Sequence, residues 1–509
     1  MSTMTIEPMH VEVVSSEDQM SNNVTRQASP TSLVDAATVR KELANLGSSA
    51  NVFGPEDGAK YQAKITSWNH DVPGTPTALV QPITTADVSA AVNVIAKLGA
   101  KLVIAGGRHG HDCLETNAIT IDMSLMKAVE VNAAEKLVTV EGGCKLGDMD
   151  RACQPFGLAC VTGTNPDTGV VGLSTAGGGG YLSRLHGMAV DNFVSAEVVL
   201  ASGEAVVCVK DGEHADLMWG LQGAGSNFGI VTKLTMKAHP VDMVYGGVCV
   251  NIAPSAKRAH SILGNWREWI TSEAPRSVMS MAVLPCGAPV VPVLAVETDM
   301  AVVPQGAKAK CSLKSIPSLK KPFGGFSAFG GLAVMKDMRR RQYHTQMQPL
   351  LEKMQAAGHY YDASCIVPDL TPEVIETLVE FTRVKHANSL ASLIIFPLNA
   401  GMTDAPTDAA SFWGGGRQKD GFWIIIEGKF KPDKAGKNRV AVVQWVKGLR
   451  EALGKFNVSD TAHTLDGNME SALAGPAAIF GDNLERLREV KAKYDPTNFW
   501  QCNRNVTPA

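Results

Sequence analysis

The sequence predicts an α+β protein with more than one folded domain. Its 509 residues are 45% hydrophobic and 19% charged, which is the composition of a large globular chain rather than of a disordered or coiled-coil protein. A strand, helix, strand pattern opens the ordered region, and a hairpin pattern follows it. Separated apolar strand segments then fill the second half. Together these patterns predict mixed sheets with helices packed against them.

The first ordered unit begins near Thr77. The apolar run 78–80 predicts a strand, Thr84 precedes a helix with an apolar face, and 101–104 predicts the next strand. This unit ends in the glycine-rich turn 105–111. Strands at 119–123 and 137–140 and a helix near 146–153 are expected next. Before this unit, residues 1–50 are rich in Ser, Thr, Asn and Asp without sustained periodicity.

The rest of the chain falls into a glycine block, a strand-rich half and a final helix. The glycine-dense block spans 163–187, and alternation over 196–209 predicts a hairpin. After Pro240, an α+β sheet with helices on one side is predicted from strand candidates at 243–251, 279–284, 290–297, 392–398 and 422–430. Asp482 is placed to cap a last helix that stops at Asp495-Pro496.

Charge and cysteine usage exclude several classes of function. The formal net charge is −3 with both signs interspersed, so nucleic acid and membrane surfaces are not expected partners. The ten cysteines form no C-x-x-C pair, and no metal site is predicted. Neither a signal peptide nor a membrane-spanning run is visible, so we expect a cytoplasmic protein.

The two glycine-rich turns are what a cofactor with a pyrophosphate needs, because only glycine lets backbone N–H groups converge without a Cβ in the way. Tight turns made for packing reasons explain each turn equally well. Neither turn gives a clean G-x-G-x-x-G in a strand, helix, strand unit, and no G-x-x-x-x-G-K-[ST] occurs. A Rossmann fingerprint is therefore a poor interpretation, and a P-loop is excluded.

Four spaced motifs, at 103–112, 168–204, 216–231 and 483–506, resemble the berberine bridge enzyme-like flavoprotein oxidases. This family belongs to the superfamily with a vanillyl-alcohol oxidase or PCMH-type FAD-binding domain. The resemblance spans about residues 76–506 and implies FAD as cofactor. It also implies a two-subdomain FAD-binding domain 71–240, a substrate-binding domain 241–460 with an antiparallel sheet flanked by helices, and a C-terminal segment 461–509 that returns to the FAD domain. The segment 1–70 before them is expected to be a partly disordered leader.

The resemblance assigns the cofactor contacts residue by residue. In the family, a histidine closing the first glycine-rich turn is bonded to the flavin 8α-methyl group, which implies His109, with His111 as the alternative. Arg108 stands where relatives more often carry glycine. The residue four before Gly169, where many relatives place a second bonding cysteine, is Asn165, so one covalent bond is expected and Cys160 is a packed thiol. The implied cofactor-binding residues are Gly106, Gly107, Arg108, His109, Gly110, Thr168, Gly169, Gly172, Gly178, Gly179, Asn192, Gly229, Ile230, Val231 and Asn503.

The substrate side offers two candidates for the base that removes a hydroxyl proton. In the strand 422–430, Trp423, Ile425 and Glu427 share one face, and Glu427 is the carboxylate best placed to act as base. An ion pair at a sheet edge explains Glu427 as well. His463 lies nearest the place where relatives carry a tyrosine, and a solvated loop histidine is the alternative there.

The function implied is oxidation of a small organic substrate, a sugar, polyol or secondary-metabolite alcohol or amine, by hydride transfer to a His-linked flavin. Dioxygen or another acceptor then takes the electrons, and Thr168 beside the flavin leaves that choice open. Two alternatives remain. One is a dehydrogenase for a hydroxy acid with noncovalent FAD, and the other is a catalytically silent flavin-binding scaffold.

Overall fold

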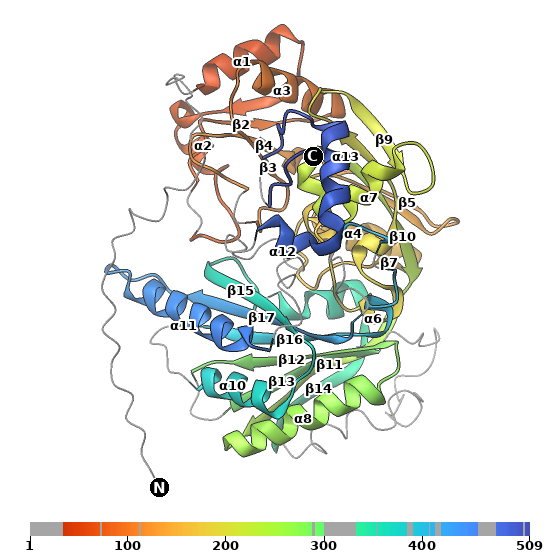
Figure 1. Ribbon diagram of the computed structural model, residues 1–509, viewed down its shortest axis with the longest axis vertical. Helices are drawn as coiled ribbons and strands as arrows, with labels where there is room; N and C mark the ends of the chain where they lie inside the picture. Colours follow the sequence, from red (N-terminus) through yellow and green to blue (C-terminus); the bar gives the residue numbers. More distant parts are fainter. Residues whose placement is uncertain are drawn as a thin grey trace. The chain divides into compact units, whose positions relative to one another are not determined.

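The computed structural model describes residues 34–71, 74–110, 113–287, 291–299, 332–352, 354–383, 390–406, 408–412, 419–456, 475–501 and 504–509. All of them belong to one compact unit, Val34–Ala509. Their strands form three sheets with helices packed against them (Figure 1), which confirms the α+β class. Within this part of the chain, every helix is too short or too polar to cross a membrane.

The first sheet has the strand order β1-β2-β4-β3. Its strands are β1 (Asn51–Phe53), β2 (Ala78–Gln81), β3 (Leu102–Ala105) and β4 (Ile119–Asp122). The predicted strand, helix, strand unit is present as β2, α3 (Thr85–Lys97) and β3, but β4 lies between the two strands and pairs with both in parallel. The helix follows Thr84 as predicted, and Thr84 caps it, because its side chain accepts from the backbone N–H of Asp87.

Folded chain extends further toward the N-terminus than the composition suggests. Helix α1 (Ala36–Asn45) packs on α3, and β1 pairs antiparallel with β2. Val39 and Leu43 of α1 are buried in the core of the first sheet. Part of the segment 1–70 is therefore folded. It supplies one strand of the first sheet and a helix that packs in the same core. The domain boundaries expected at residues 70, 240 and 460 stay predictions.

The second sheet is antiparallel, with the order β5-β6-β10-β8-β9, and β7 pairs with the far end of β10. Its strands are β5 (Val129–Asn132), β6 (Leu137–Glu141), β7 (Leu158–Cys160), β8 (Phe193–Val199), β9 (Ala205–Val209) and β10 (Ile230–Pro240). The predicted hairpin is confirmed as β8 and β9, which pair from Val199 and Ala205 outward. Helix α4 (Leu146–Cys153) also has its predicted bounds.

The C-terminal segment packs on this second layer through helix α13 (Leu484–Tyr494), which contacts α7 (Ala215–Ala224). Its N-cap is Asn483, so the prediction that Asp482 caps the helix is one residue early. Lys491 is fully buried, forms a 2.7 Å ion pair with Asp495, and donates a 2.6 Å hydrogen bond to the carbonyl of Asn227.

The third sheet has seven antiparallel strands in the order β14-β11-β13-β12-β16-β17-β15. They are β11 (Met243–Ala253), β12 (Val278–Pro285), β13 (Val291–Asp299), β14 (Leu332–Gln342), β15 (His359–Val367), β16 (Ser392–Leu398) and β17 (Gly421–Phe430). Five of these strands were expected, whereas β14 and β15 were not. The helices α8 (Ala256–Ser272), α10 (Pro372–Thr382) and α11 (Lys437–Gly454) are packed in sequence along this sheet.

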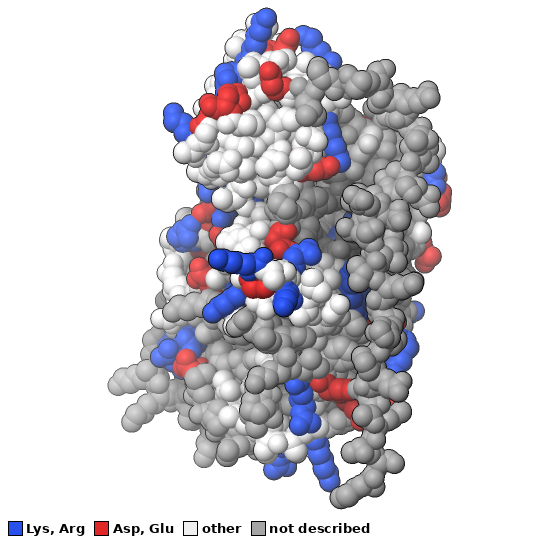
Figure 2. Space-filling model, turned by 90° about the vertical axis from the view of Figure 1, so that its left-hand side faces the viewer, with Lys and Arg blue, Asp and Glu red and all other residues white. Residues whose placement is uncertain are grey.

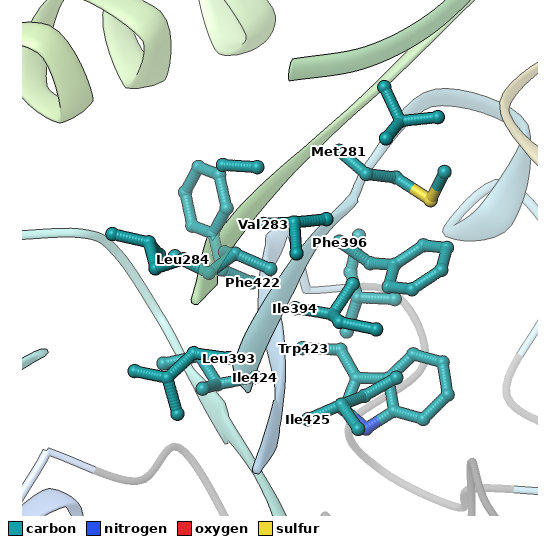
Figure 3. Close-up of a cluster of buried hydrophobic side chains, with 14 of the residues drawn as sticks. Met281, Val283, Leu284, Leu393, Ile394, Phe396, Phe422, Trp423, Ile424 and Ile425 are labelled. Carbon is teal, nitrogen blue, oxygen red and sulfur yellow. The ribbon is translucent and has the colours of Figure 1, made fainter. Parts of the chain in front are cut away.

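Side chains of the third sheet alternate between two buried faces. Figure 3 shows Leu284, Leu393, Phe422 and Ile424 on one side and Met281, Ile394, Phe396, Trp423 and Ile425 on the other. Phe422 meets Trp266 of α8 at a ring-centroid distance of 5.8 Å, so its side is the helix-covered face. By strand alternation, Glu427 lies with Trp423 on the opposite face.

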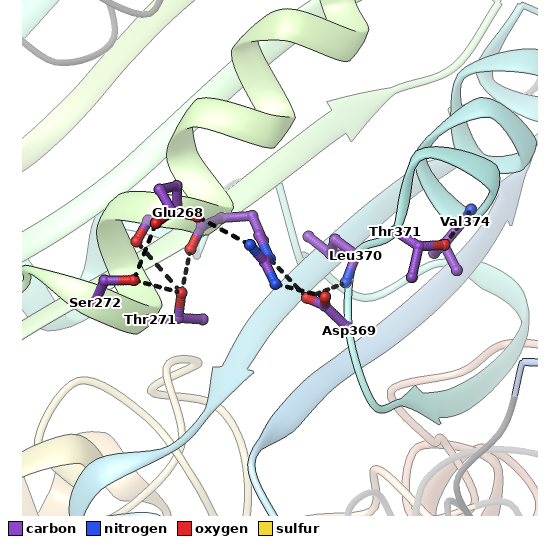
Figure 4. A network of polar contacts seen from close by, with 8 residues as sticks. Glu268, Thr271, Ser272, Asp369, Leu370, Thr371 and Val374 are labelled. Atoms are coloured by element: carbon purple, nitrogen blue, oxygen red, sulfur yellow. Dashed lines mark hydrogen bonds and ion pairs between the residues drawn. The ribbon is translucent and has the colours of Figure 1, made fainter.

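A polar network fixes α8 to the loop before α10 (Figure 4). The Arg267 guanidinium donates to both oxygens of Asp369, at 2.7 and 2.6 Å, and to Glu268 at 2.9 Å. Thr371 caps α10 by accepting from Val374. The bidentate ion pair therefore joins two of the covering helices. On the surface drawn in Figure 2, basic and acidic side chains are interspersed wherever residues are described.

Candidate active site

The two glycine-rich turns meet backbone to backbone. A Cβ added to Gly107 would lie 2.1 Å from the backbone nitrogen of Gly169, and one added to Gly169 would lie 2.5 Å from that of Gly107. Side chains at either position would push the turns apart. Hydrogen bonds hold the second turn against the start of α4, with the Leu146 N–H donating to the Thr168 carbonyl at 2.9 Å. The two glycine-rich turns, which are far apart in the sequence, therefore form one joint, in which Gly107 and Gly169 are in backbone contact.

Arg108 adopts the left-handed backbone conformation, with φ of +61°. Glycine would adopt this conformation without a Cβ penalty. The guanidinium donates to Asp122 at 2.6 Å and to the carbonyls of Lys64 and Thr66. The Arg108 carbonyl in turn accepts from the backbone N–H of Trp68 at 2.9 Å. Arg108 therefore fixes the segment that carries Trp68.

His109 is buried, with 6% of its surface exposed, and stacks on Trp68. The ring centroids are 4.6 Å apart with an interplanar angle of 17°, and the Tyr360 ring also stacks on Trp68, with a centroid distance of 4.3 Å. Among the described residues, the Nε2 atom of His109 has no hydrogen-bond partner. The nearest carboxylate oxygen is Oδ2 of Asp167, at 3.8 Å.

Asp167 is held by its own neighbours. The Lys145 ammonium donates to Oδ1 at 2.5 Å, and the backbone N–H of Asp167 donates to the Asn165 side chain at 3.1 Å. Burial raises the pKa of Asp167, but interactions with His109 and Lys145 outweigh it and lower the pKa to about 2. The carboxylate beside His109 is therefore ionised near neutral pH.

Glu427 is connected to the same stack through Gln355. Its carboxylate accepts from the Ser392 hydroxyl at 2.7 Å and from the Gln355 side chain at 3.4 Å, and 9% of the residue is exposed. The Gln355 carbonyl accepts from the Trp68 indole N–H at 3.0 Å. Strand β17 lies inside the sheet, between β16 and β15, so the alternative of an ion pair at a sheet edge fits Glu427 less well.

The structure thus connects His109 and Glu427 through one aromatic stack, and Thr168 lies where the two glycine turns meet. Burial raises the pKa of the Tyr360 phenol, and the charges of Glu427 and Asp362 raise it further, so Tyr360 stays protonated. No sequence pattern predicted Trp68, Gln355 or Tyr360 as site residues. Trp68 falls in the segment interpreted as leader, and an aromatic residue followed by Asn69 was the one signal available there.

Several predicted cofactor contacts have structural roles in the fold. Gly229 has φ of +158°, and a Cβ on it would lie 2.4 Å from the Val199 carbonyl oxygen. The Asn192 amide nitrogen donates to the carbonyls of His186 and Met188, and the amide oxygen accepts from Nε2 of His239 at 2.9 Å. Similar explanations hold for Gly178, whose φ is +73°, and for Ile230 and Val231, which are buried in β10.

Gly172 differs from these positions because a Cβ there would meet no atom within 4 Å. It lies in the first turn of helix α5 (Val170–Thr175), where backbone N–H groups lack intrahelical partners. Gly106 and Gly179 have less free space, because a Cβ added to them would lie 3.4 and 3.1 Å from the nearest atom. Gly110 is half-buried. Cys160 is a free, buried thiol in β7, as predicted. His111, His463 and Asn503 lie outside the described residues.

These features fit a large planar redox cofactor. A buried imidazole beside the first turn, two glycine turns in backbone contact and an open helix start at Gly172 are what a dinucleotide cofactor with a planar ring requires. No amino-acid side chain accepts a hydride, so oxidation at this site depends on such a group.

Comparison with known proteins supports the same assignment. Residues 76–209 match the family model of an FAD binding domain, and residues 468–507 match the model described as berberine and berberine like. The chain is 28% identical over 443 residues to an FAD-linked oxidoreductase of Dictyostelium discoideum, covering 87% of this chain and 91% of that protein. It is 25% identical over 468 residues to the xylooligosaccharide oxidase of Thermothelomyces thermophilus, covering 89% and 91%.

The fold is shared with solved structures as well. The structure of berberine bridge enzyme from Eschscholzia californica superposes with a TM-score of 0.80 at 17% sequence identity, covering 92% of this chain and 99% of that one.

Proposed function

Because this chain belongs to the berberine bridge enzyme-like FAD-linked oxidoreductases, we propose that it oxidises a small organic alcohol or amine at the His109 and Glu427 site. FAD is its cofactor, and the chain is an enzyme. The proposed substrate is a sugar, polyol or secondary-metabolite alcohol or amine. The named activity of the xylooligosaccharide oxidase supports a carbohydrate among these.

The observation that carries the proposal is the connection between the two halves of the site. Trp68 stacks on His109 and also donates to Gln355, whose side chain reaches Glu427. When bound, the flavin supplies the hydride acceptor. The imidazole of His109 anchors that group, and Glu427, oriented by Ser392, accepts the proton of the substrate hydroxyl.

We propose dioxygen as the final electron acceptor. Thr168 is buried, with 6% exposed, and sits at the joint of the two glycine turns. The Thr168 side chain is small, so it leaves more room for dioxygen beside the cofactor than a larger apolar side chain would. A dehydrogenase with another acceptor is the competing possibility, and turnover with dioxygen alone separates the two.

The test combines a linkage assay with a substrate screen. Trichloroacetic acid precipitation of the purified protein should leave the yellow colour in the pellet, and His109→Ala should release it to the supernatant. In stopped-flow experiments with a panel of oligosaccharides and phenolic alcohols, at least one class of compound should reduce the flavin and remove its yellow colour. Air should then reoxidise the flavin, with formation of hydrogen peroxide. A colourless pellet refutes the linkage. A flavin that air does not reoxidise refutes the oxidase reaction.

A further inference from the structure

We propose that Asp167 is a positioning residue for flavin attachment, which keeps the proton of His109 on Nε2 and leaves Nδ1 as the nitrogen that bonds the cofactor. This inference rests on the proposed attachment at His109 and adds a residue that the family resemblance does not assign.

The backbone contact between the turns brings the two residues together. Gly107 and Gly169 approach so closely that neither position tolerates a Cβ, and His109 and Asp167 each lie two residues from this contact. Oδ2 of Asp167 consequently faces Nε2 of His109 at 3.8 Å. The distance is too long for a hydrogen bond, and a small rotation of either side chain would close it.

The carboxylate is fixed in this position by other contacts. Lys145 holds Oδ1 at 2.5 Å, and the hydrogen bond from the Asp167 backbone to Asn165 fixes the turn. Oδ2 is therefore the oxygen directed to His109. Lys145 thus forms its ion pair with the other carboxylate oxygen, Oδ1, and not with Oδ2.

An ionised carboxylate sets the tautomer of a neutral imidazole that faces it. The tautomer whose N–H points at the negative charge is lower in energy than the one whose lone pair points at it. The proton of His109 therefore resides on Nε2, and the lone pair is on Nδ1. Stacking on Trp68, at an interplanar angle of 17°, opposes tilting of the ring. Burial of His109 removes the water that would otherwise stabilise both tautomers equally.

The attachment step balances with dioxygen as oxidant. One C–H bond of the flavin 8α-methyl group breaks and one C–N bond to Nδ1 forms. The hydrogens lost are one from the methyl group and one from Nε2, and with the two electrons they convert dioxygen into hydrogen peroxide. While Nε2 still carries its proton, the alkylated ring is cationic, and Asp167 stabilises that charge as well.

The experiment compares wild-type protein with Asp167→Asn, Asp167→Glu and Asp148→Asn. Each protein is incubated with FAD in air, and acid-precipitable flavin is followed over time beside total bound flavin. Asp148, in the first turn of α4, accepts from Arg151 and from the Lys145 backbone N–H, so its variant controls for loss of a nearby carboxylate.

Asp167→Asn should bind FAD but attach it at least about tenfold more slowly, the equivalent of about 1.4 kcal/mol. Asp167→Glu should recover most of the rate, and Asp148→Asn should match the wild type. Attachment by Asp167→Asn at the wild-type rate overturns the inference alone. So does failure of Asp167→Asn to bind FAD, which indicates a structural role. Wild-type protein without acid-stable flavin overturns the proposed linkage and this role together.

Discussion

Arg108 combines a left-handed backbone with a buried ion pair, and these two properties act on stability in opposite directions. Its φ of +61° costs about 1 kcal/mol relative to glycine. Its partner Asp122 has no exposed surface, and removing one member of a buried pair costs about 3 to 5 kcal/mol. The ion pair therefore dominates.

We expect Arg108→Gly to lower the free energy of unfolding by about 2 to 4 kcal/mol, and Arg108→Ala by about 1 kcal/mol more, because alanine loses the ion pair and keeps the strain. Urea unfolding of the three proteins measures both differences. Equal stability of the glycine and alanine variants would contradict the strain, and a glycine variant as stable as wild type would contradict the ion pair.

Glu427 is expected to act in catalysis and not in cofactor binding, because it lies in strand β17 and accepts from Ser392 and Gln355, whereas the cofactor contacts are assigned to the glycine turns. Glu427→Gln keeps the shape and both partners but cannot accept a proton. Flavin reduction by substrate should slow by about 100-fold or more, while acid-precipitable flavin stays at the wild-type level. Ser392→Ala, which only removes an orienting hydrogen bond, should slow reduction much less. Loss of flavin from the glutamine variant would show that Glu427 serves binding.

Asp150 of α4 predicts a pH dependence of stability. It is buried with 4% exposed, and Oδ2 has no hydrogen-bond partner among the described residues. Burial raises the pKa of Asp150 from 3.8 to about 8, against a smaller opposing effect of Arg151. The folded protein therefore holds this proton up to about pH 8, while the unfolded chain releases it near pH 4.

Because the folded state binds the extra proton, the contribution of Asp150 to the free energy of unfolding falls between pH 4 and 8, by up to about 1.4 kcal/mol per unit. Asp150→Asn has no proton to lose, so its stability relative to wild type should rise through this window. Urea denaturation at several pH values measures the difference. Parallel profiles for the two proteins would show that the carboxyl is not held protonated.

At the scale of elements, the joint between the two glycine turns makes a prediction that separates packing from cofactor contact. Gly107→Ala places a Cβ 2.1 Å from the Gly169 backbone, so the turns must separate and both stability and FAD binding should fall. Gly172→Ala meets nothing within 4 Å, so the apoprotein should unfold at the wild-type urea concentration. If the cofactor passes over the start of α5, this variant should still bind FAD more weakly. Wild-type affinity would place the cofactor elsewhere.

The elements that could be predicted from sequence are those with local signals. The hairpin of β8 and β9 has a Ser-Gly turn between alternating strands, and α3 has a capping box. Strand β14 was missed because Lys336, Asp337 and the arginines at 339–341 hide its periodicity. Strand β15 mixes Tyr360, Asp362 and Ser364 on one face, since that face lines the candidate site rather than a dry core.

At the scale of the whole molecule, the site depends on contacts that no local pattern contains. Trp68 bonds to Gln355, which is 287 residues away, and Asn165 bonds to the same carbonyl across 190 residues. The family motifs indicated both glycine turns, but the residues between them and Glu427 carry no motif. Their roles follow from the packing of the third sheet against the turns, which only the folded chain shows.

That packing depends on Arg184, which lies in helix α6 (Ser183–His186) within the second motif and is 3% exposed. Its guanidinium donates to the Asn399 side chain at 2.7 Å, to the Pro275 carbonyl at 2.9 Å and to the Val278 carbonyl. It also reaches carbonyls at the end of α8, where the helix dipole favours a cation. Burial lowers the pKa of Arg184 to about 10, and the side chain stays charged near neutral pH.

Arg184→Lys keeps the charge but replaces the planar guanidinium, whose N–H groups point in several directions, with a single ammonium group. The ammonium cannot donate to all of these carbonyls at once. We expect it to lower the free energy of unfolding by about 2 to 3 kcal/mol, and Arg184→Met by more, because several buried carbonyls then lose their donors. Differential scanning calorimetry should show the loss chiefly in the third sheet, as a broadened or divided transition.

Arg276→Lys, whose pair with Asp404 is exposed, is the matched control and should change little. A single sharp transition for Arg184→Met at the wild-type temperature would mean that the apolar contacts between Tyr181, Met188 and the sheet hold the layers together without the cation.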